Sequence, residues 1–286
     1  MAEAEDTISD EILAPAPKAE AEIAKRGRGR PPGSKNKTKE LPTEPPKSPA
    51  PQTIENTPED AAVSRAMRDA LEKLDFESMG SADRWLILLV RDTSPSEQPH
   101  EKEFHEGANA IGPVLAADRL AANLVDVALC YGAEDFKVID CQHAKNFVMP
   151  QHVEYGRGTA GAPWFRGITR VCKDYREHLD DLGVAVGGTF VVVASDFLLG
   201  DDFVSALREF QELQHADPKL VVIPAGFGNW VPQVAEQVSV RIKPVDLNSF
   251  RIFDFLKIVA TSMRELSCSR PEDRQSVIDK LNDLNG

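Results

Sequence analysis

Residues 84–96 are Arg-Trp-Leu-Ile-Leu-Leu-Val-Arg-Asp-Thr-Ser-Pro-Ser, and this stretch decides the fold. Leu86–Val90 is a continuous apolar run bounded by charged residues, which is typical of a strand buried on both faces in a parallel sheet. Asp92, Ser94 and Ser96 follow it in a D-x-S-x-S pattern, so a carboxylate and two hydroxyls stand at the strand's end. Mg²⁺ prefers such hard oxygen ligands, and the stretch therefore predicts a divalent-cation site. A simple polar turn after a strand is the alternative.

A second apolar strand is predicted over residues 189–194, and it also ends in an acid, at Ser195-Asp196. A third apolar run covers residues 220–223, and amphipathic stretches alternate with these runs. Such alternation predicts an α/β fold with a doubly wound, mostly parallel sheet and helices on both faces. In these sheets ligands bind beyond the carboxyl ends of strands that send their helices to opposite sides. If the two strands are neighbours, Asp92 and Asp196 face one crevice.

Periodicity and capping residues predict the remaining elements. Helices are expected over 58–78, over 101–122 with a kink or break near Gly112, over 162–182, from Asp201 onward, over 231–237 and over 250–266. Short strands are expected over 125–129, 136–140 and 238–242, and residues 268–286 form a polar tail.

Composition bounds the class of protein. The chain has 286 residues and a net charge of −13, and this overall negative charge does not indicate binding to nucleic acid. Four scattered cysteines without a C-x-x-C pair favour reduced thiols in an intracellular protein. Neither a membrane-length apolar run nor a secretion signal is present in the sequence. We therefore expect a soluble, cytoplasmic protein.

Residues 1–57 are rich in Ala, Pro, Glu and Lys and contain too few large apolar side chains to form a core, so we expect a disordered tail. Within it, residues 25–39 carry seven positive charges and no negative one. The core Arg28-Gly29-Arg30-Pro31 suits the narrow minor groove of A·T-rich DNA, and the flanking Lys residues suit phosphates.

This block resembles the AT-hook of chromatin-associated proteins, and the resemblance continues through Pro-Gly-Ser-Lys-Asn-Lys. It implies a weak tether to A·T-rich DNA and a nucleoid-associated protein. A solvated basic linker is the alternative. The expected DNA-binding residues are Lys25, Arg26, Arg28, Gly29, Arg30, Pro31, Lys35 and Lys37.

From about residue 82 to 267 the chain resembles a von Willebrand factor type A (VWA) domain, and most closely the bacterial tellurium-resistance and stress-response group. The D-x-S-x-S pattern and the later Ser195-Asp196 stand where that family has two loops of its metal-ion-dependent adhesion site (MIDAS). The resemblance implies Mg²⁺ or Mn²⁺ held by Asp92, Ser94, Ser96 and Asp196. It also implies binding of a protein partner rather than catalysis.

The third MIDAS loop departs from the family pattern. Ala162 aligns with the expected Thr, and Thr159 is three residues early, so it substitutes only if the loop is rebuilt. Pro95, Glu97 and Phe197 also replace usual residues. The interaction surface is therefore either metal-dependent or metal-free.

Three functions follow from these patterns. The favoured one is a non-enzymatic adaptor that binds a protein partner at the Asp92/Asp196 crevice and is tethered to A·T-rich DNA by the tail. The second is a nucleoid-associated DNA-binding protein whose globular domain only oligomerises. The third is a metal-dependent phosphotransfer or hydrolytic enzyme that uses Asp92 and Asp196, although the D-x-D or Lys partners of such enzymes are missing from the sequence.

Overall fold

The structure is a computed structural model of the chain, and it describes residues 57–76, 82–269 and 274–283. The predicted AT-hook and the tail around it lie outside the described residues.

The described residues form a six-stranded sheet in the order β3-β2-β1-β4-β5-β6. Every neighbouring pair is parallel except β2–β3, which is antiparallel. The predicted α/β class with a mostly parallel sheet is therefore confirmed. The strands are β1 (Arg84–Asp92), β2 (Val125–Gly132), β3 (Phe136–His143), β4 (Val186–Ser195), β5 (Leu220–Gly226) and β6 (Val245–Asp246).

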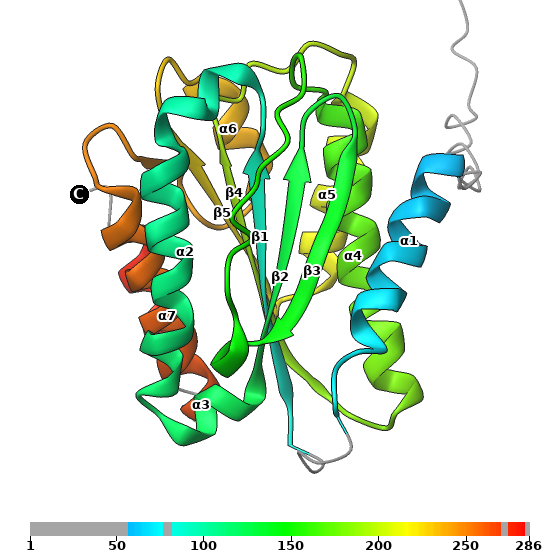
Figure 1. Ribbon diagram of the computed structural model, residues 1–286, viewed down its shortest axis with the longest axis vertical. Coiled ribbons are helices and arrows are strands. Elements are labelled where there is room, and N and C mark those ends of the chain that lie inside the picture. Colours follow the sequence, from blue (N-terminus) through cyan, green and yellow to red (C-terminus); the bar gives the residue numbers. More distant parts are fainter. Residues whose placement is uncertain (1–56, 77–81, 270–273, 284–286) are drawn as a thin grey trace, which may run out of the picture. The chain divides into compact units, whose positions relative to one another are not determined.

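Helices cover both faces of this sheet (Figure 1). One face carries α2 (Glu101–Ala116), α3 (Arg119–Leu124), α7 (Ile252–Cys268) and α8 (Arg274–Asn282). The other carries α1 (Pro58–Leu71), α4 (Gly161–Asp181), α5 (Val204–Ala216) and α6 (Pro232–Val238). Short 3-10 helices lie at Pro95–His100 and Ala144–Asn146.

Strand β1 lies in the middle of the sheet, and every one of its residues is buried. Successive side chains of a strand point to opposite faces. Leu89 accordingly packs in the core with Phe104 of α2, while Val90 packs in the opposite core with Trp164 of α4. A strand that is apolar on both faces can occupy only such a position.

Two predicted helix boundaries are corrected. Helix α1 ends at Leu71 rather than near residue 78. Phe76 lies beyond the helix, where its ring packs against the ring of His143. Of the predicted kink or break near Gly112, the break is absent, since α2 continues to Ala116. A Cβ on Gly112 would lie 2.9 Å from the carbonyl oxygen of Ala144, so this glycine allows close packing and does not end the helix.

Two predictions in the second half of the domain also fail. The strand expected over 238–242 is absent from the described residues, where the edge strand is β6 instead. The guanidinium group of Arg241 donates to the carbonyl oxygens of Gln214 and Leu220, which holds this segment against α5 and β5. Helix α5 begins at Val204 and not at Asp201, for a reason that lies in the candidate site.

Candidate functional site

The candidate site lies at the carboxyl ends of β1 and β4. These strands are parallel neighbours, with Arg91 in register with Ala194. Strand β1 leads to α2 on one face of the sheet, and β4 leads to α5 on the other. The crevice therefore forms where neighbouring strands send their helices to opposite sides, which is the usual place for ligands in such sheets.

The four residues predicted as metal ligands come together in this crevice. Ser96 Oγ donates to Asp196 Oδ2 over 2.8 Å, and Ser94 Oγ lies 2.9 Å from Ser96 Oγ. The Ser94 backbone N–H donates to Asp92 Oδ1 over 2.7 Å, so the loop folds back on its own carboxylate. Residues a hundred positions apart thus share one hydrogen-bonded network.

The third loop delivers its hydroxyl from Thr159. Thr159 Oγ1 donates to Asp92, at 3.3 Å from Oδ1 and 3.2 Å from Oδ2. Ser195 Oγ donates to Asp92 Oδ2 over 2.7 Å and adds a second hydroxyl on the same carboxylate. Ala162, by contrast, lies in the first turn of α4. The loop before α4 therefore places the Thr159 hydroxyl beside the Asp92 carboxylate. The family pattern expects this hydroxyl at position 162, where the chain has Ala162.

Asp201 holds the end of the loop that carries Thr159, where α4 begins. Its carboxylate accepts hydrogen bonds from the backbone N–H groups of Gly161 (2.6 Å) and Ala162 (2.9 Å). These groups stand at the N-terminus of α4, which has no side-chain cap of its own. A carboxylate is favoured there by the free N–H groups and the helix dipole. Asp201 therefore caps α4 rather than starting α5.

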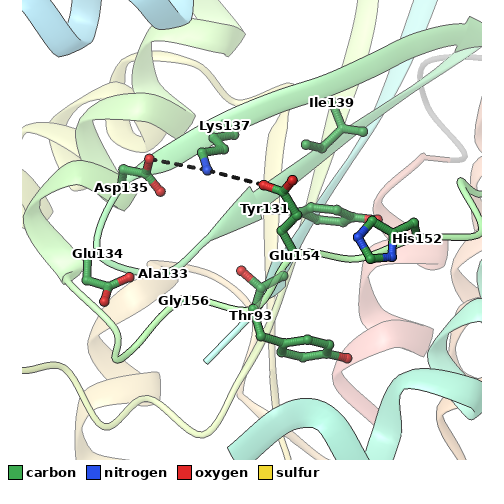
Figure 2. Close-up of a pocket in the computed structure, with 11 residues that line it drawn as sticks. Thr93, Tyr131, Ala133, Glu134, Asp135, Lys137, Ile139, His152, Glu154 and Gly156 are labelled. Carbon is green, nitrogen blue, oxygen red and sulfur yellow. Dashed lines mark ion pairs between the residues drawn. The ribbon is translucent and has the colours of Figure 1, made fainter. Parts of the chain in front are cut away.

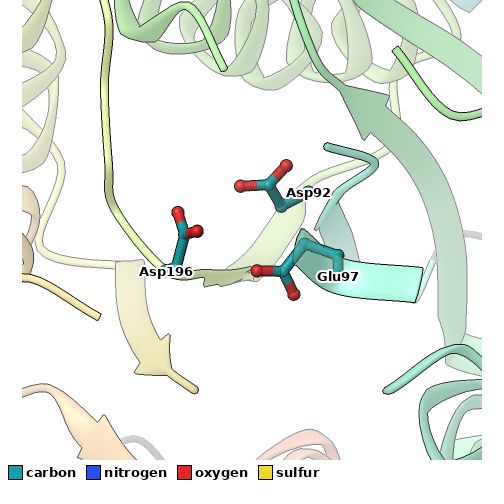
Figure 3. A group of neighbouring side chains, drawn as sticks. All are labelled: Asp92, Glu97 and Asp196. Atoms are coloured by element: carbon teal, nitrogen blue, oxygen red, sulfur yellow. The ribbon is translucent and has the colours of Figure 1, made fainter. Parts of the chain in front are cut away.

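Glu97 is the site residue that the sequence reasoning missed. Figure 3 shows its carboxylate turned toward Asp92 and Asp196, and one ligand atom from each of the three lies within 4.8 Å of the others. The 3-10 helix Pro95–His100 turns Glu97 inward, where its side chain is 1% exposed. Its position directly after D-x-S-x-S is the sequence signal for this role, although Glu97 departs from the family pattern there.

The pKa values of Asp92 and Glu97 are both raised in this site. Burial raises the pKa of Asp92 to about 6, and the charge of Asp196 adds to this rise, while hydrogen bonds from Ser195 and Ser94 oppose it. Burial also raises the pKa of Glu97 to about 9, with further increases from the charges of Asp92 and Asp196. Without a cation the site therefore disfavours ionisation of all three carboxyl groups, and Glu97 keeps its proton at neutral pH.

A divalent cation fits this arrangement. Glu97 Oε2 is buried, and it accepts no hydrogen bond from any residue that the structure describes. A buried carboxylate oxygen without a donor is unfavourable, and a cation bound to it removes that cost. The surrounding donors are carboxylate and hydroxyl oxygens, which suit Mg²⁺ or Mn²⁺.

The edge of the site is partly apolar and faces solvent. Ser96 is exposed, and the Leu198 side chain, two residues after Asp196, is 55% exposed. Phe197, which lies between Asp196 and Leu198 in sequence, has a positive φ of 55° and a buried ring. The loop after β4 therefore buries Phe197 and presents Leu198 outward, next to the carboxylates.

In the part of the chain that the structure describes, no helix combines the length and apolar character needed to cross a membrane.

Comparison with known proteins gives structural matches only. No protein-family profile matches the chain, and no curated protein matches it by sequence. Solved structures that match include proximal thread matrix protein 1 from the mussel byssus (15% identity, TM-score 0.42, 66% of this chain and 49% of that chain). Another is von Willebrand factor type A from Catenulispora acidiphila (13% identity, TM-score 0.44, 64% of this chain and 43% of that chain). A third is BatB from Bacteroides thetaiotaomicron (13% identity, TM-score 0.40, 64% of this chain and 99% of that chain).

The chain spans about half the length of the first two of these proteins. VWA structures are thus among the matches, and the mussel protein has also been solved with a zinc-occupied MIDAS motif.

Proposed function

We propose that residues 82–267 form a VWA-like, non-enzymatic binding domain that holds a divalent cation at Asp92, Glu97 and Asp196. The hydroxyls of Ser94, Ser96 and Thr159 complete the site. The observation that carries the proposal is a group of three carboxylates with one ligand atom from each within 4.8 Å of the others, in which Glu97 also has a buried Oε2 without a hydrogen-bond partner among the described residues. The proposal is also supported by the D-x-S-x-S pattern at the end of β1.

When bound, the cation neutralises the carboxylates and offers a coordination position to an acidic side chain of a protein partner. This chain's own residues prepare the site for that partner. Ser94, Ser195 and Thr159 orient Asp92 by hydrogen bonds, and Ser96 orients Asp196. The exposed side chain of Leu198 supplies an apolar contact next to the site. These features favour an adaptor that binds protein.

Calorimetry with Mg²⁺ and Mn²⁺ on the full chain tests the cation site. The wild-type protein is expected to bind one ion with saturable heat. Asp92→Asn and Glu97→Gln should each weaken binding at least tenfold. Glu177→Gln, which changes an exposed carboxylate on α4, should bind as the wild type does. Absence of saturable heat in the wild type, or equal binding by all variants, would contradict the cation site.

We also propose that the N-terminal segment tethers the domain to A·T-rich DNA in the nucleoid, with Lys25, Arg26, Arg28, Gly29, Arg30, Pro31, Lys35 and Lys37 in the minor groove or on phosphates. Its support is the sequence of residues 25–39. Fluorescence anisotropy should show binding to an A·T-rich duplex that is weaker on a G·C-rich duplex and is lost in Arg28→Ala/Arg30→Ala. The same double variant should keep the Mg²⁺ affinity of the wild type. Equal affinity for both duplexes would contradict an AT-hook and favour a basic linker.

A further inference from the structure

A pocket of about 550 Å³ lies next to the carboxylate cluster, at the carboxyl ends of β1 and β2 (Figure 2). Thr93, which follows Asp92, lines it together with Tyr131 of β2. Gly156 also lines it, and its N–H donates to the carbonyl oxygen of Thr93 over 2.9 Å. Three residues later the same loop brings Thr159 to Asp92. The pocket and the cluster therefore share one strand end and one loop.

Acidic side chains dominate the charge of this pocket. Glu134, Asp135 and Glu154 line it with three carboxylates, and Lys137 is the one ammonium group among the lining residues. An anionic ligand would meet repulsion from these carboxylates. An uncharged apolar ligand would remove them from water without a compensating charge. The lining is therefore complementary to a cation.

Lys137 already places a cation between two of these acids. Figure 2 shows its ammonium group between Asp135 and Glu154, at 3.6 Å and 3.9 Å. Both distances exceed those of a hydrogen bond. The Lys137 side chain is 52% exposed, and exposed pairs of this kind contribute little to stability. A cation of a binding partner can therefore displace Lys137 at small cost.

Tyr131 supplies an independent sign of a ligand. Its hydroxyl is buried and has no hydrogen-bond partner among the described residues, and the whole residue is 6% exposed. Figure 2 shows the ring among the lining side chains, with the hydroxyl on the side of His152. A phenol oxygen accepts a hydrogen bond from a guanidinium or ammonium group. The half-buried ring of Tyr155 also contributes aromatic surface, and it already has the guanidinium of Arg91 5.8 Å from its centroid.

We propose that this pocket binds the Arg or Lys side chain of a protein partner, and that the partner carries an acidic residue close to that basic one. The basic side chain pairs with Asp135 and Glu154 and lies beside Tyr131. The acidic side chain reaches the neighbouring cation site, and this second half rests on the function proposed above. The partner class is thus a protein segment with a basic and an acidic residue a few positions apart.

The pocket is tested by amide chemical-shift titration of the full chain with Nα-acetyl-arginine amide in EDTA. Nα-acetyl-citrulline amide, which has nearly the same shape and no charge, is the control ligand. We expect saturable shifts at Ala133, Glu134, Glu154 and Gly156 with the arginine compound alone, with a dissociation constant in roughly the millimolar range for so small a ligand. Equal shifts with both compounds, or no saturable shift, would overturn the pocket.

Matched variants separate a cation pocket from a merely structural cluster. Glu154→Gln should weaken arginine binding at least threefold. Lys137→Met should strengthen it at least twofold, because the protein's own ammonium group no longer competes. Glu177→Gln on α4 should leave it unchanged. A structural role for Lys137 predicts no gain in the methionine variant, and that result would overturn the displacement of Lys137.

A peptide that carries Arg and Glu separated by two Gly residues tests the partner class. Its affinity should rise at least tenfold when Mg²⁺ replaces EDTA, and Glu97→Gln should remove this gain while leaving arginine-amide binding intact. Equal affinity in Mg²⁺ and EDTA would overturn the paired acidic residue. Failure of Mg²⁺ binding in calorimetry would remove the cation site alone, since the arginine-amide titration does not depend on it.

Discussion

At the residue scale, Glu97 sets the balance between stability and function. Its side chain is buried with an unpartnered oxygen, beside two further carboxylates. Without a cation this arrangement opposes folding, because Glu97, with a pKa of about 9, must take up a proton when it is buried at neutral pH. Binding sites commonly retain such unfavourable groups because their function needs them.

Replacing Glu97 by Gln should therefore stabilise the cation-free protein while weakening cation binding. We expect the free energy of unfolding in EDTA at neutral pH to rise by roughly 1–3 kcal/mol, since the amide keeps the shape and needs no proton uptake on folding, whereas Glu97 with its pKa of about 9 does. Urea unfolding in EDTA measures this change. A loss of stability in Glu97→Gln would show that the carboxylate has a partner in the folded protein.

Substitutions at Thr159 and Ala162 should affect Mg²⁺ affinity differently, because only Thr159 contacts Asp92 in the structure. Thr159→Val removes the hydroxyl that donates to Asp92 and should lower Mg²⁺ affinity about tenfold, as the loss of groups that orient metal ligands usually does. Ala162→Thr should give no gain, because Ala162 lies in the first turn of α4. Calorimetry on both variants measures their Mg²⁺ affinities. A gain in affinity in Ala162→Thr would mean that position 162, as the family pattern predicts, supplies the hydroxyl of the third loop.

The raised pKa values of Asp92 and Glu97 predict how stability depends on pH. An acid whose pKa is higher in the folded protein releases its proton first in the unfolded chain, so the free energy of unfolding falls as pH rises. Asp92 contributes from its ordinary 3.8 to about 6, and Glu97 from 4.5 to about 9. Melting temperatures in EDTA should therefore fall between pH 6 and pH 9. Glu97→Gln should flatten this decline, and an identical slope in the variant would contradict the assignment.

At the element scale, Asp201 holds the start of α4. Asp201→Ala should leave the N–H groups of Gly161 and Ala162 without their acceptor and lower the free energy of unfolding by about 1 kcal/mol, up to about 2. Asp202→Ala is the matched control, since Asp202 is bonded only weakly to Val204 N, at 3.4 Å. Urea unfolding of both variants measures the difference. Equal losses would mean that the cap does not stabilise α4.

The central strands were predictable from sequence, whereas the short edge strand β6 and the loops between strands were not. Strands β1 and β4 are apolar on both faces, and such runs fit only the middle of a covered sheet. Thr159 and Asp201 depend instead on contacts across 67 and 40 positions in sequence. No local pattern encodes such contacts. For the same reason the crevice could be inferred from Asp92 and Asp196, while the inward turn of Glu97 required the structure.

At the scale of the whole molecule, cation binding should raise the thermal stability of the full chain. A ligand at one hundred times its dissociation constant adds about 2.7 kcal/mol when it binds only the folded state. For a domain of this size that corresponds to a rise in melting temperature of roughly 5–10 °C. Thermal unfolding with Mg²⁺ and then with excess EDTA measures the rise and its reversal. A melting temperature that ignores both additions would argue for a metal-free surface.

The cap between Asp201 and α4 also has a mechanical consequence. Asp201 lies five residues after Asp196, so the loop that carries a site carboxylate is fastened to the first turn of α4. Helix α4 is in turn joined to α1, where Arg166 pairs with Asp60 at 3.8 Å and Arg170 donates to Ser64. A shift of the loop after β4 would therefore be transmitted through α4 to Asp60 and Ser64 of α1.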